Sequence, residues 1–325
     1  MKPKVLVGRK IQEAPLALLR EQAEVTVNPE DRPMTPEEFG AQLPGKVALL
    51  AAGSDRVTAQ VLETGRDLKI VANNAVGYNN IDVTAATRLK IAATNTPEVL
   101  TDTTADLAFA LMLAVARRMG EAERFVRAGK WVGFHPNLLL GGDVHGKTLG
   151  VVGLGRIGSA VAKRALGFNM EILYNDIRKI ESGLVDMLRA KFLPLQELLA
   201  KSDFVTLHVP LTAETTHLIG REELRRMKKS AFLVNASRGP VVDEKALAEA
   251  LQAGIIAGAG LDVFEKEPQV TPELLKMENV VLVPHIGSAT QATREKMAFV
   301  AVRNILAVLR GEVPPNILNP EIYPK

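Results

Sequence analysis

The sequence predicts an α/β protein with two domains, each a doubly wound parallel sheet. Short apolar segments rich in β-branched residues alternate with segments of helical period along most of the chain, which is typical of parallel βαβ units. The length of 325 residues is generous for a single hydrophobic core and suits two domains.

The first series of predicted strands lies in the N-terminal third, at residues 4–7, 24–27, 47–51, 68–72 and 90–94. Between two of them, Thr35 offers an N-cap, followed by a proline and two glutamates suited to a first helical turn. Residues 80–83 are expected to open another helix, because apolar positions recur at helical spacing there.

A long helix is predicted from residue 101 or 102 to Met119, with Thr and Asp residues at its start. Arg117 and Arg118 then lie in its last turns, where the helix dipole favours cations, and Gly120 ends it. Its apolar stretch, residues 107–116, is about half the length of a bilayer span, so we expect a buried helix.

Residues 128–146 are rich in glycine and lack periodicity, which predicts a crossing between the two domains. A second series of strands follows, at residues 148–152, 171–174, 191–193, 204–207, 231–234, 256–261 and 280–283.

The composition excludes several classes of protein. The chain has no cysteine, which rules out a disulfide scaffold, a thiolate nucleophile and a Cys-ligated metal, and fits a cytoplasmic location. We expect no metal site. The 40 basic and 37 acidic residues are mixed along the chain, so we expect no nucleic-acid partner. The apolar run at residues 5–7 is too short for a signal-peptide core, and no membrane association is expected.

A glycine-rich motif joins the first strand of the second series to a helix. Gly153 permits a tight turn, Gly155 lets the backbone approach a pyrophosphate, and Gly158 lets helix and strand pack closely. An acid, Asp176, ends the next strand. A strand, a GxGxxG motif, a helix and a following acid together predict a dinucleotide site.

Asp176 indicates a preference for NAD(H) over NADP(H), because its carboxylate accepts hydrogen bonds from the ribose hydroxyls and repels a 2′-phosphate. A preference for NADP(H) remains open, because Arg178 and Lys179 follow closely enough in the sequence for either cation to neutralise a 2′-phosphate.

A nicotinamide enzyme that reduces a carbonyl needs an acid and a cation that holds the substrate. Of the five histidines, His208 and His285 each follow an apolar strand, and strand carboxyl ends face the ligand crevice of an open α/β sheet. His135 and His145 lie in the glycine-rich stretch, and His217 lies in a polar loop or at a helix start. Spacing alone does not choose between His208 and His285.

Arg238 and Glu267 follow two further apolar strands. Three strand ends thus bring an arginine, a carboxylate and a histidine to one edge of a sheet, which together indicate an active site.

Five motifs of the sequence match those of a known family. They are GVVGLGRIG at 150–158, LHVPLT at 207–212, NASRG at 235–239, GLDVFEKEP at 260–268 and PHIGSAT at 284–290. With these motifs, the sequence resembles the D-2-hydroxyacid dehydrogenase family over nearly the whole chain.

The resemblance implies that Arg238 binds the carboxylate and carbonyl of the substrate, that His285 is the acid/base, and that Glu267 keeps the imidazole protonated. Residues 73–82 are similar to the family's substrate loop, in which backbone N–H groups near Val76 and Gly77 hold the carboxylate.

The resemblance also implies a set of cofactor contacts, among which Asp262 hydrogen-bonds the nicotinamide carboxamide. The set is Thr104, Gly153, Gly155, Arg156, Ile157, Gly158, Asp176, His208, Val209, Pro210, Ala236, Ser237, Asp262 and Gly287.

Within the family, residues 95–106 and 309–314 look most like glyoxylate/hydroxypyruvate reductases, so we expect NAD(P)H-dependent reduction of glyoxylate or hydroxypyruvate. Many of these enzymes prefer NADPH and carry an arginine where this chain has Asp176 and Ile177. One alternative is another D-2-hydroxyacid dehydrogenase, such as a short-form phosphoglycerate dehydrogenase. An alternative of another class is an NAD(H)-sensing, corepressor-like interaction protein, which the intact set of Arg238, Glu267 and His285 disfavours.

The expected architecture is a flavodoxin-like substrate domain, residues 1–100 and 288–325, and a Rossmann cofactor domain, residues 101–287. The active site is expected in the cleft between them. The helix predicted at 101–119 resembles the family's dimer element, so we expect a homodimer.

Overall fold

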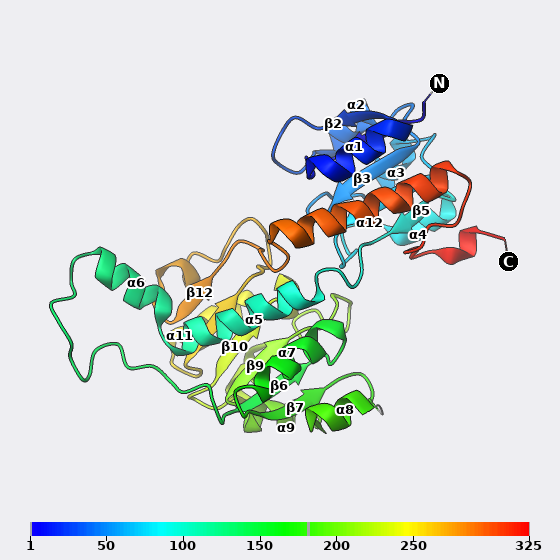
Figure 1. Ribbon diagram of the computed structural model, residues 1–325. Helices are drawn as coiled ribbons and strands as arrows, with labels where there is room; N and C mark the ends of the chain where they lie inside the picture. Colours follow the sequence, from blue (N-terminus) through cyan, green and yellow to red (C-terminus); the bar gives the residue numbers. More distant parts are fainter. Residues whose placement is uncertain (1, 181–182, 325) are drawn as a thin grey trace. The chain divides into compact units, whose positions relative to one another are not determined.

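The computed structural model describes residues 2–180 and 183–324, and the chain divides into two compact units (Figure 1). Unit 1 comprises Met1–Leu100 and Ser288–Lys325, and unit 2 comprises Thr101–Gly287. Each unit contains one sheet in which every strand pair is parallel, with helices packed on both faces. The predicted α/β class with two doubly wound sheets is confirmed.

Unit 1 has a five-stranded sheet in the order β2-β1-β3-β4-β5, which is the flavodoxin-like order. Its strands are β1 (Lys4–Val7), β2 (Glu24–Val27), β3 (Ala48–Ala52), β4 (Ile70–Asn74) and β5 (Ala92–Thr94). Its α-helices are α1 (Glu13–Gln22), α2 (Pro36–Gln42), α3 (Ala59–Thr64), α4 (Val83–Arg88) and α12 (Gln291–Leu309), and a 3₁₀ turn spans Pro320–Ile322.

Side chains of β1 point alternately to the two faces of this sheet, as the pleat requires. Val5 and Val7 pack in a core with α1 and α12, while Leu6 packs in the opposite core with α2 and α3. A strand buried on both faces must be apolar at every position, which explains the uninterrupted apolar run at residues 5–7.

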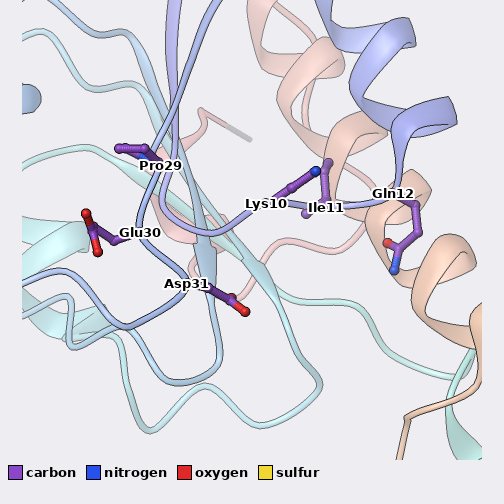
Figure 2. A pocket seen from close by; sticks show the side chains of 6 residues that line it. All are labelled: Lys10, Ile11, Gln12, Pro29, Glu30 and Asp31. Carbon is purple, nitrogen blue, oxygen red and sulfur yellow. The ribbon is translucent and has the colours of Figure 1, made fainter.

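The loops that follow β1 and β2 line an open pocket of about 390 Å³ in unit 1 (Figure 2). Lys10, Ile11, Gln12, Pro29, Glu30 and Asp31 line it. Its charged side chains are exposed, and none of the expected site residues is among them.

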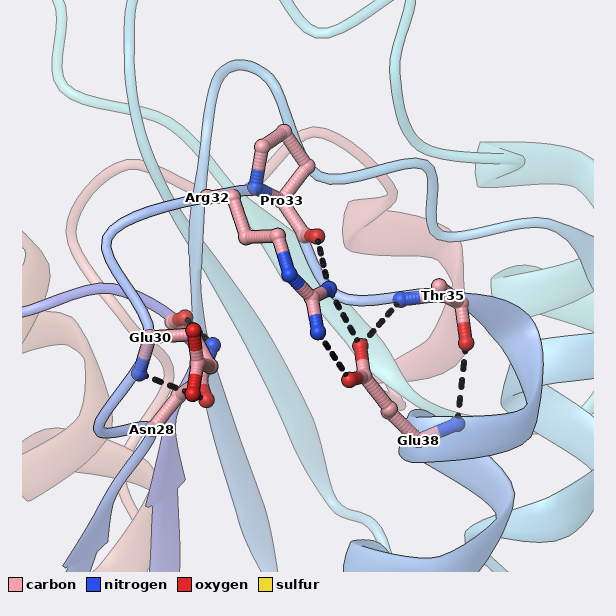
Figure 3. A network of polar contacts seen from close by, with 7 residues as sticks. Asn28, Glu30, Arg32, Pro33, Thr35 and Glu38 are labelled. Carbon is pink, nitrogen blue, oxygen red and sulfur yellow. Dashed lines mark hydrogen bonds and ion pairs between the residues drawn. The ribbon is translucent and has the colours of Figure 1, made fainter.

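The predicted N-cap at Thr35 is confirmed, and α2 begins with a complete capping box (Figure 3). The Thr35 hydroxyl accepts the Glu38 N–H at 3.3 Å, and the Glu38 carboxylate accepts the Thr35 N–H at 2.8 Å. Arg32 also donates to Glu38, and this hydrogen bond is the main cause that lowers the pKa of Glu38 to about 2.

Unit 2 has a seven-stranded sheet in the order β12-β11-β10-β9-β6-β7-β8, the Rossmann order with one further strand. The strands are β6 (Thr148–Val152), β7 (Glu171–Asn175), β8 (Lys191–Phe192), β9 (Phe204–Leu207), β10 (Phe232–Asn235), β11 (Gly258–Leu261) and β12 (Val280–Leu282). The α-helices are α5 (Thr101–Ala116), α6 (Met119–Arg127), α7 (Arg156–Leu166), α8 (Gly183–Leu188), α9 (Leu195–Lys201), α10 (Arg221–Arg226) and α11 (Glu244–Gln252). Two 3₁₀ turns span Gly239–Val241 and Leu274–Lys276.

The predicted long helix ends earlier than expected. α5 stops at Ala116, Arg118 takes a left-handed conformation (φ 52°), and Gly120 lies inside the next helix, α6. The returning loop explains the break, because the Gly142 N–H donates to the Ala116 carbonyl at 2.8 Å. This bond uses an acceptor that a continuing helix would have needed.

Residues 128–146 form no helix or strand, as predicted, but the proposed crossing between domains is wrong. The whole stretch belongs to unit 2, and the chain passes between the units after residues 100 and 287. Across residues 2–180 and 183–324, every helix is too short or too polar to cross a membrane.

Candidate active site

The residues predicted to carry chemistry follow three adjacent strands of unit 2. Arg238 follows β10, Glu267 follows β11 and His285 follows β12, and these strands pair in parallel. Their carboxyl ends therefore share one edge of the sheet, as the sequence predicted.

Glu267 and His285 are in direct contact at this edge. The Glu267 Oε2 and His285 Nδ1 atoms lie 2.9 Å apart, and the two side chains are 37% and 48% exposed. His285 has φ 52°, and its N–H donates to the Asp262 carbonyl at 2.8 Å. Histidine is among the non-glycine residues enriched in this left-handed region, and the hydrogen bond to Asp262 holds it there.

The Glu267 carboxylate is ionised at neutral pH. Burial opposes ionisation, but the hydrogen bond and charge of His285, the Phe264 N–H and the charge of Arg238 together lower the pKa of Glu267 below its usual value. The negative charge of Glu267 beside His285 is therefore present at neutral pH, and it is lost as the pH falls through that lowered pKa.

Arg238 lies on a braced turn. The Asn235 side chain accepts the Ser237 N–H at 3.0 Å and donates to the Arg238 carbonyl at 2.9 Å, while the Arg238 guanidinium donates to the Ser237 carbonyl at 2.7 Å. Burial lowers the pKa of Arg238 and the charge of Glu267 opposes this, so the half-buried guanidinium remains a cation at neutral pH.

The glycine-rich turn after β6 has the geometry that a dinucleotide phosphate needs. Gly153 has φ 90°, and a Cβ on Gly158 would lie 2.0 Å from the Gly153 carbonyl oxygen, so both positions require glycine. A Cβ on Gly155 would meet only open space, and α7 begins at the next residue. The N–H groups at the start of this helix suit a pyrophosphate that approaches at Gly155.

Asp176, after β7, is fixed by two backbone N–H groups. Its Oδ2 accepts from Leu154 at 2.9 Å and its Oδ1 accepts from Ile177 at 2.8 Å. The carboxylate is therefore tied to the glycine-rich turn itself, while Arg178 and Lys179 are exposed.

The structure distinguishes His208 from His285, between which the sequence did not choose a candidate acid. His208 is partly buried, and the desolvation of its imidazole lowers its pKa to about 3 and keeps it neutral. Its Nε2 lies 2.8 Å from the Thr206 hydroxyl, and its Nδ1 has no partner among the described residues. His285, by contrast, is half-exposed and paired with a carboxylate.

Asp262 holds the segment that carries His285. Its carboxylate accepts the Ile286 N–H at 2.6 Å and the Gly287 N–H at 2.9 Å. Burial raises the pKa of Asp262, although these two hydrogen bonds and the charge of His285 oppose the rise. Thr104 packs beside Gly287, where a Cβ would lie 3.3 Å from the Thr104 methyl group.

The other predicted cofactor residues of unit 2 also lie at strand ends or at a helix start. Arg156 and Ile157 begin α7, Val209 and Pro210 follow β9, and Ala236 and Ser237 follow β10.

In unit 1, the loop after β4 turns its carbonyl groups inward. The Ala75 carbonyl accepts the Thr96 N–H, the Val76 carbonyl accepts the Asn95 side chain, and the Gly77 carbonyl accepts the Asn73 side chain. The N–H groups of Val76 and Gly77 have no acceptor among the described residues, so they are available to a ligand.

The structure does not bring His135, His145 or His217 to the pair formed by Glu267 and His285. His135 and His145 lie in the stretch 128–146, and His217 lies in a turn and contacts Glu265 instead, at 3.1 Å. Sequence reasoning missed Glu265 and the buried Glu244. In the sequence, Glu244 follows the N-cap Asp243 and indicates only the start of a helix. Nothing local to it predicts a contact with a distant loop.

No group of three or more His, Asp or Glu side chains suited to a metal ion occurs within residues 2–180 and 183–324.

The family model described as D-isomer specific 2-hydroxyacid dehydrogenase, NAD binding domain, matches residues 109–287, more than half of the chain. The chain belongs to the D-isomer specific 2-hydroxyacid dehydrogenase family, as the motifs implied, and contains an NAD(P)-binding domain.

The more specific likeness is to glyoxylate reductases. A glyoxylate reductase from Korarchaeum cryptofilum is 53% identical over 325 residues, covering 99% of this chain and 97% of the relative. The TT0316 protein of Thermus thermophilus is 45% identical with a TM-score of 0.90, over 97% of this chain and 99% of that one. An NADPH-dependent glyoxylate/hydroxypyruvate reductase from Sinorhizobium meliloti, solved with NADP and malonate, is 34% identical with a TM-score of 0.88, over 100% and 99%.

Proposed function

We propose that this protein reduces glyoxylate or hydroxypyruvate to the corresponding 2-hydroxy acid, with His285 as the acid. The observation that carries the proposal is the 2.9 Å contact between Glu267 and His285 at the edge where Arg238 also emerges. The likeness to a named glyoxylate reductase at 53% identity supports the substrate class.

A bound nicotinamide would supply the hydride that reduces the carbonyl carbon. His285 donates the proton from Nε2 to the carbonyl oxygen, because its Nδ1 is engaged by Glu267. Arg238 binds the substrate carboxylate and polarises the carbonyl with its planar, two-pronged guanidinium. In unit 1, the N–H groups of Val76 and Gly77 suit a carboxylate ligand.

Steady-state rates with glyoxylate, hydroxypyruvate, pyruvate and 3-phosphoglycerate, each with both nicotinamide cofactors, test the proposal. We expect the highest kcat/KM for glyoxylate or hydroxypyruvate. Turnover confined to 3-phosphoglycerate would assign the chain to another activity of the family, and NADH binding without any turnover would favour a sensor.

We propose that the enzyme prefers NADH, because the Asp176 carboxylate is fixed at the glycine-rich turn. Removing its charge in Asp176→Asn or Asp176→Ala should raise the ratio of NADPH to NADH kcat/KM about fivefold or more, since two charges about 4 Å apart repel by roughly 1 to 4 kcal/mol. Asp186→Ala, which removes an exposed carboxylate on α8, should leave the ratio unchanged.

A parent enzyme that already prefers NADPH would contradict this assignment. In that case Arg178→Ala or Lys179→Ala should lower NADPH use, because these exposed cations then bind the 2′-phosphate.

We propose that the protein forms a homodimer through α6 and the stretch that follows it. Val132 and Phe134 are 99% and 92% exposed, and Met119, Val126 and Trp131 are more than half exposed on the same segment. Exposed apolar side chains clustered on one segment are typical of a contact with another chain.

Phe134→Asp should therefore lower the dimer fraction in sedimentation equilibrium, because the contact would bury a charge. The control is Ile177→Asp, an equally exposed position in unit 2 outside the segment, which should leave the mass unchanged. A monomeric parent protein, or a dimer insensitive to Phe134→Asp, would show that this segment is not the contact.

A further inference from the structure

The loop between β11 and β12 is fastened by a buried carboxylate that the proposed mechanism does not use. Glu244, the first residue of α11, is 6% exposed. Its Oε2 accepts the Glu265 N–H at 2.8 Å, and its Oε1 accepts the Thr271 N–H at 2.7 Å. These two donors flank Glu267 in the chain, so one side chain closes the loop on both sides of it.

Glu265 in turn binds Glu244 through its own carboxylate. Its Oε2 accepts the backbone N–H of Glu244 at 3.2 Å, and its Oε1 lies 3.1 Å from His217 Nε2. An acid at a helix start commonly interacts only with the helix dipole and with water. The Glu244 carboxylate is instead buried, and both of its oxygens bind a loop distant in sequence.

The fastened loop leads directly to the acid–base pair. The Phe264 N–H donates to Glu267 Oε1 at 3.1 Å, and Glu267 Oε2 lies 2.9 Å from His285 Nδ1. A Cβ on Gly239 would lie 1.8 Å from the Phe264 carbonyl oxygen, so the turn that carries Arg238 also touches this loop. Any shift of residues 264–265 therefore changes the contact between Glu267 and His285.

We propose that Glu244 is a positioning residue, which acts through the backbone N–H groups of Glu265 and Thr271 to hold Glu267 against the His285 imidazole. The inference rests on the proposed function of Glu267 and His285. The charges of Asp262 and Arg238 also act on this pair, and within residues 2–180 and 183–324 neither side chain bonds to Glu244.

The test compares Glu244→Gln and Glu244→Ala with the parent enzyme. Glu244→Ala should lower kcat for reduction by about 10- to 10²-fold, as expected when a reacting group is misplaced by roughly 1 Å. The rate of reduction should begin to fall at a lower pH than in the parent enzyme, because a displaced Glu267 stabilises the protonated form of His285 less. Glu244→Gln keeps one acceptor oxygen and the side-chain volume, so its changes in kcat and in the pH profile should be smaller. This variant tests the inference even if Glu244→Ala does not fold.

NADH binding, measured by fluorescence titration, should remain unchanged in both variants, because Glu244 does not contact the glycine-rich turn. The matched control is Glu249→Gln on the same helix, which removes an ion pair with Arg221 and should change neither kcat nor the pH profile.

The double variant Glu244→Ala/Glu267→Gln decides whether Glu244 acts through Glu267. If it does, Glu244→Ala adds no further pH shift once Glu267→Gln is present, because coupled residues are not additive. A lower melting temperature with an unmoved pH profile, or a shift that persists in the double variant, would overturn the inference. If Glu267→Gln alone leaves the pH profile unmoved, the proposed function of that pair fails instead.

Discussion

His285→Ala is expected to lower kcat for 2-oxoacid reduction by about 10²- to 10⁴-fold while NADH binding stays intact, because the variant has no group to protonate the carbonyl oxygen. His285 is half-exposed and paired with Glu267, so its Nε2 is available to a substrate. Single-turnover kinetics and a fluorescence titration with NADH measure the two quantities separately.

Two controls accompany this variant. His145→Ala removes an exposed imidazole of the same unit and should have no effect. His208→Ala removes a neutral, desolvated imidazole, so it should alter cofactor binding more than the protonation step. If His208→Ala abolishes turnover while His285→Ala leaves the rate intact, the assignment of the acid is wrong.

Glu267→Gln extends the same test to pH. The carboxylate favours the imidazolium, so its loss should make the rate of reduction fall at lower pH than in the parent enzyme. Oxidation of the hydroxy acid requires the neutral imidazole, and its rising limb should move to lower pH as well. A limb that moves to higher pH would contradict the pairing.

Arg238→Lys is expected to lower kcat/KM for the 2-oxoacid by about 10- to 10²-fold, because losing one charged hydrogen bond costs about 1.5 to 3 kcal/mol. An ammonium group is a point charge and cannot bind a carboxylate and a carbonyl with two parallel N–H groups. Steady-state kinetics with varied substrate measure the loss.

The substitution should weaken the use of the 2-oxoacid and not the binding of NADH. Affinity for NADH, measured without substrate, should stay close to that of the parent enzyme. Weak NADH binding combined with a normal KM for the 2-oxoacid would instead mean that Arg238 serves the cofactor.

Local features of the sequence predicted the cofactor turn and the helix caps. Gly153 and Gly158 are required by a backbone conformation and by a 2.0 Å approach within one strand–turn–helix unit, so spacing along the chain was sufficient. The capping box of Thr35 and Glu38 likewise involves neighbours three residues apart. Such features depend on short-range geometry, which is the same in most folds.

The end of α5 shows why other features were missed. Residues 101–119 carry good helix formers, and nothing local signals a break at Arg117. The break depends on Gly142, which reaches the Ala116 carbonyl only after the intervening stretch has folded back. A local pattern cannot report a contact made by a segment that returns from elsewhere in the chain.

The sequence by itself determined the α/β class, the two parallel sheets, the dinucleotide turn and the three strand ends that carry Arg238, Glu267 and His285. Only the tertiary structure decided that the His208 imidazole is desolvated and neutral whereas His285 is exposed and paired with Glu267. It alone also revealed that Glu244 fastens the loop of Glu267. Burial and pairing depend on which distant side chains surround a group, and spacing along the chain does not contain that information.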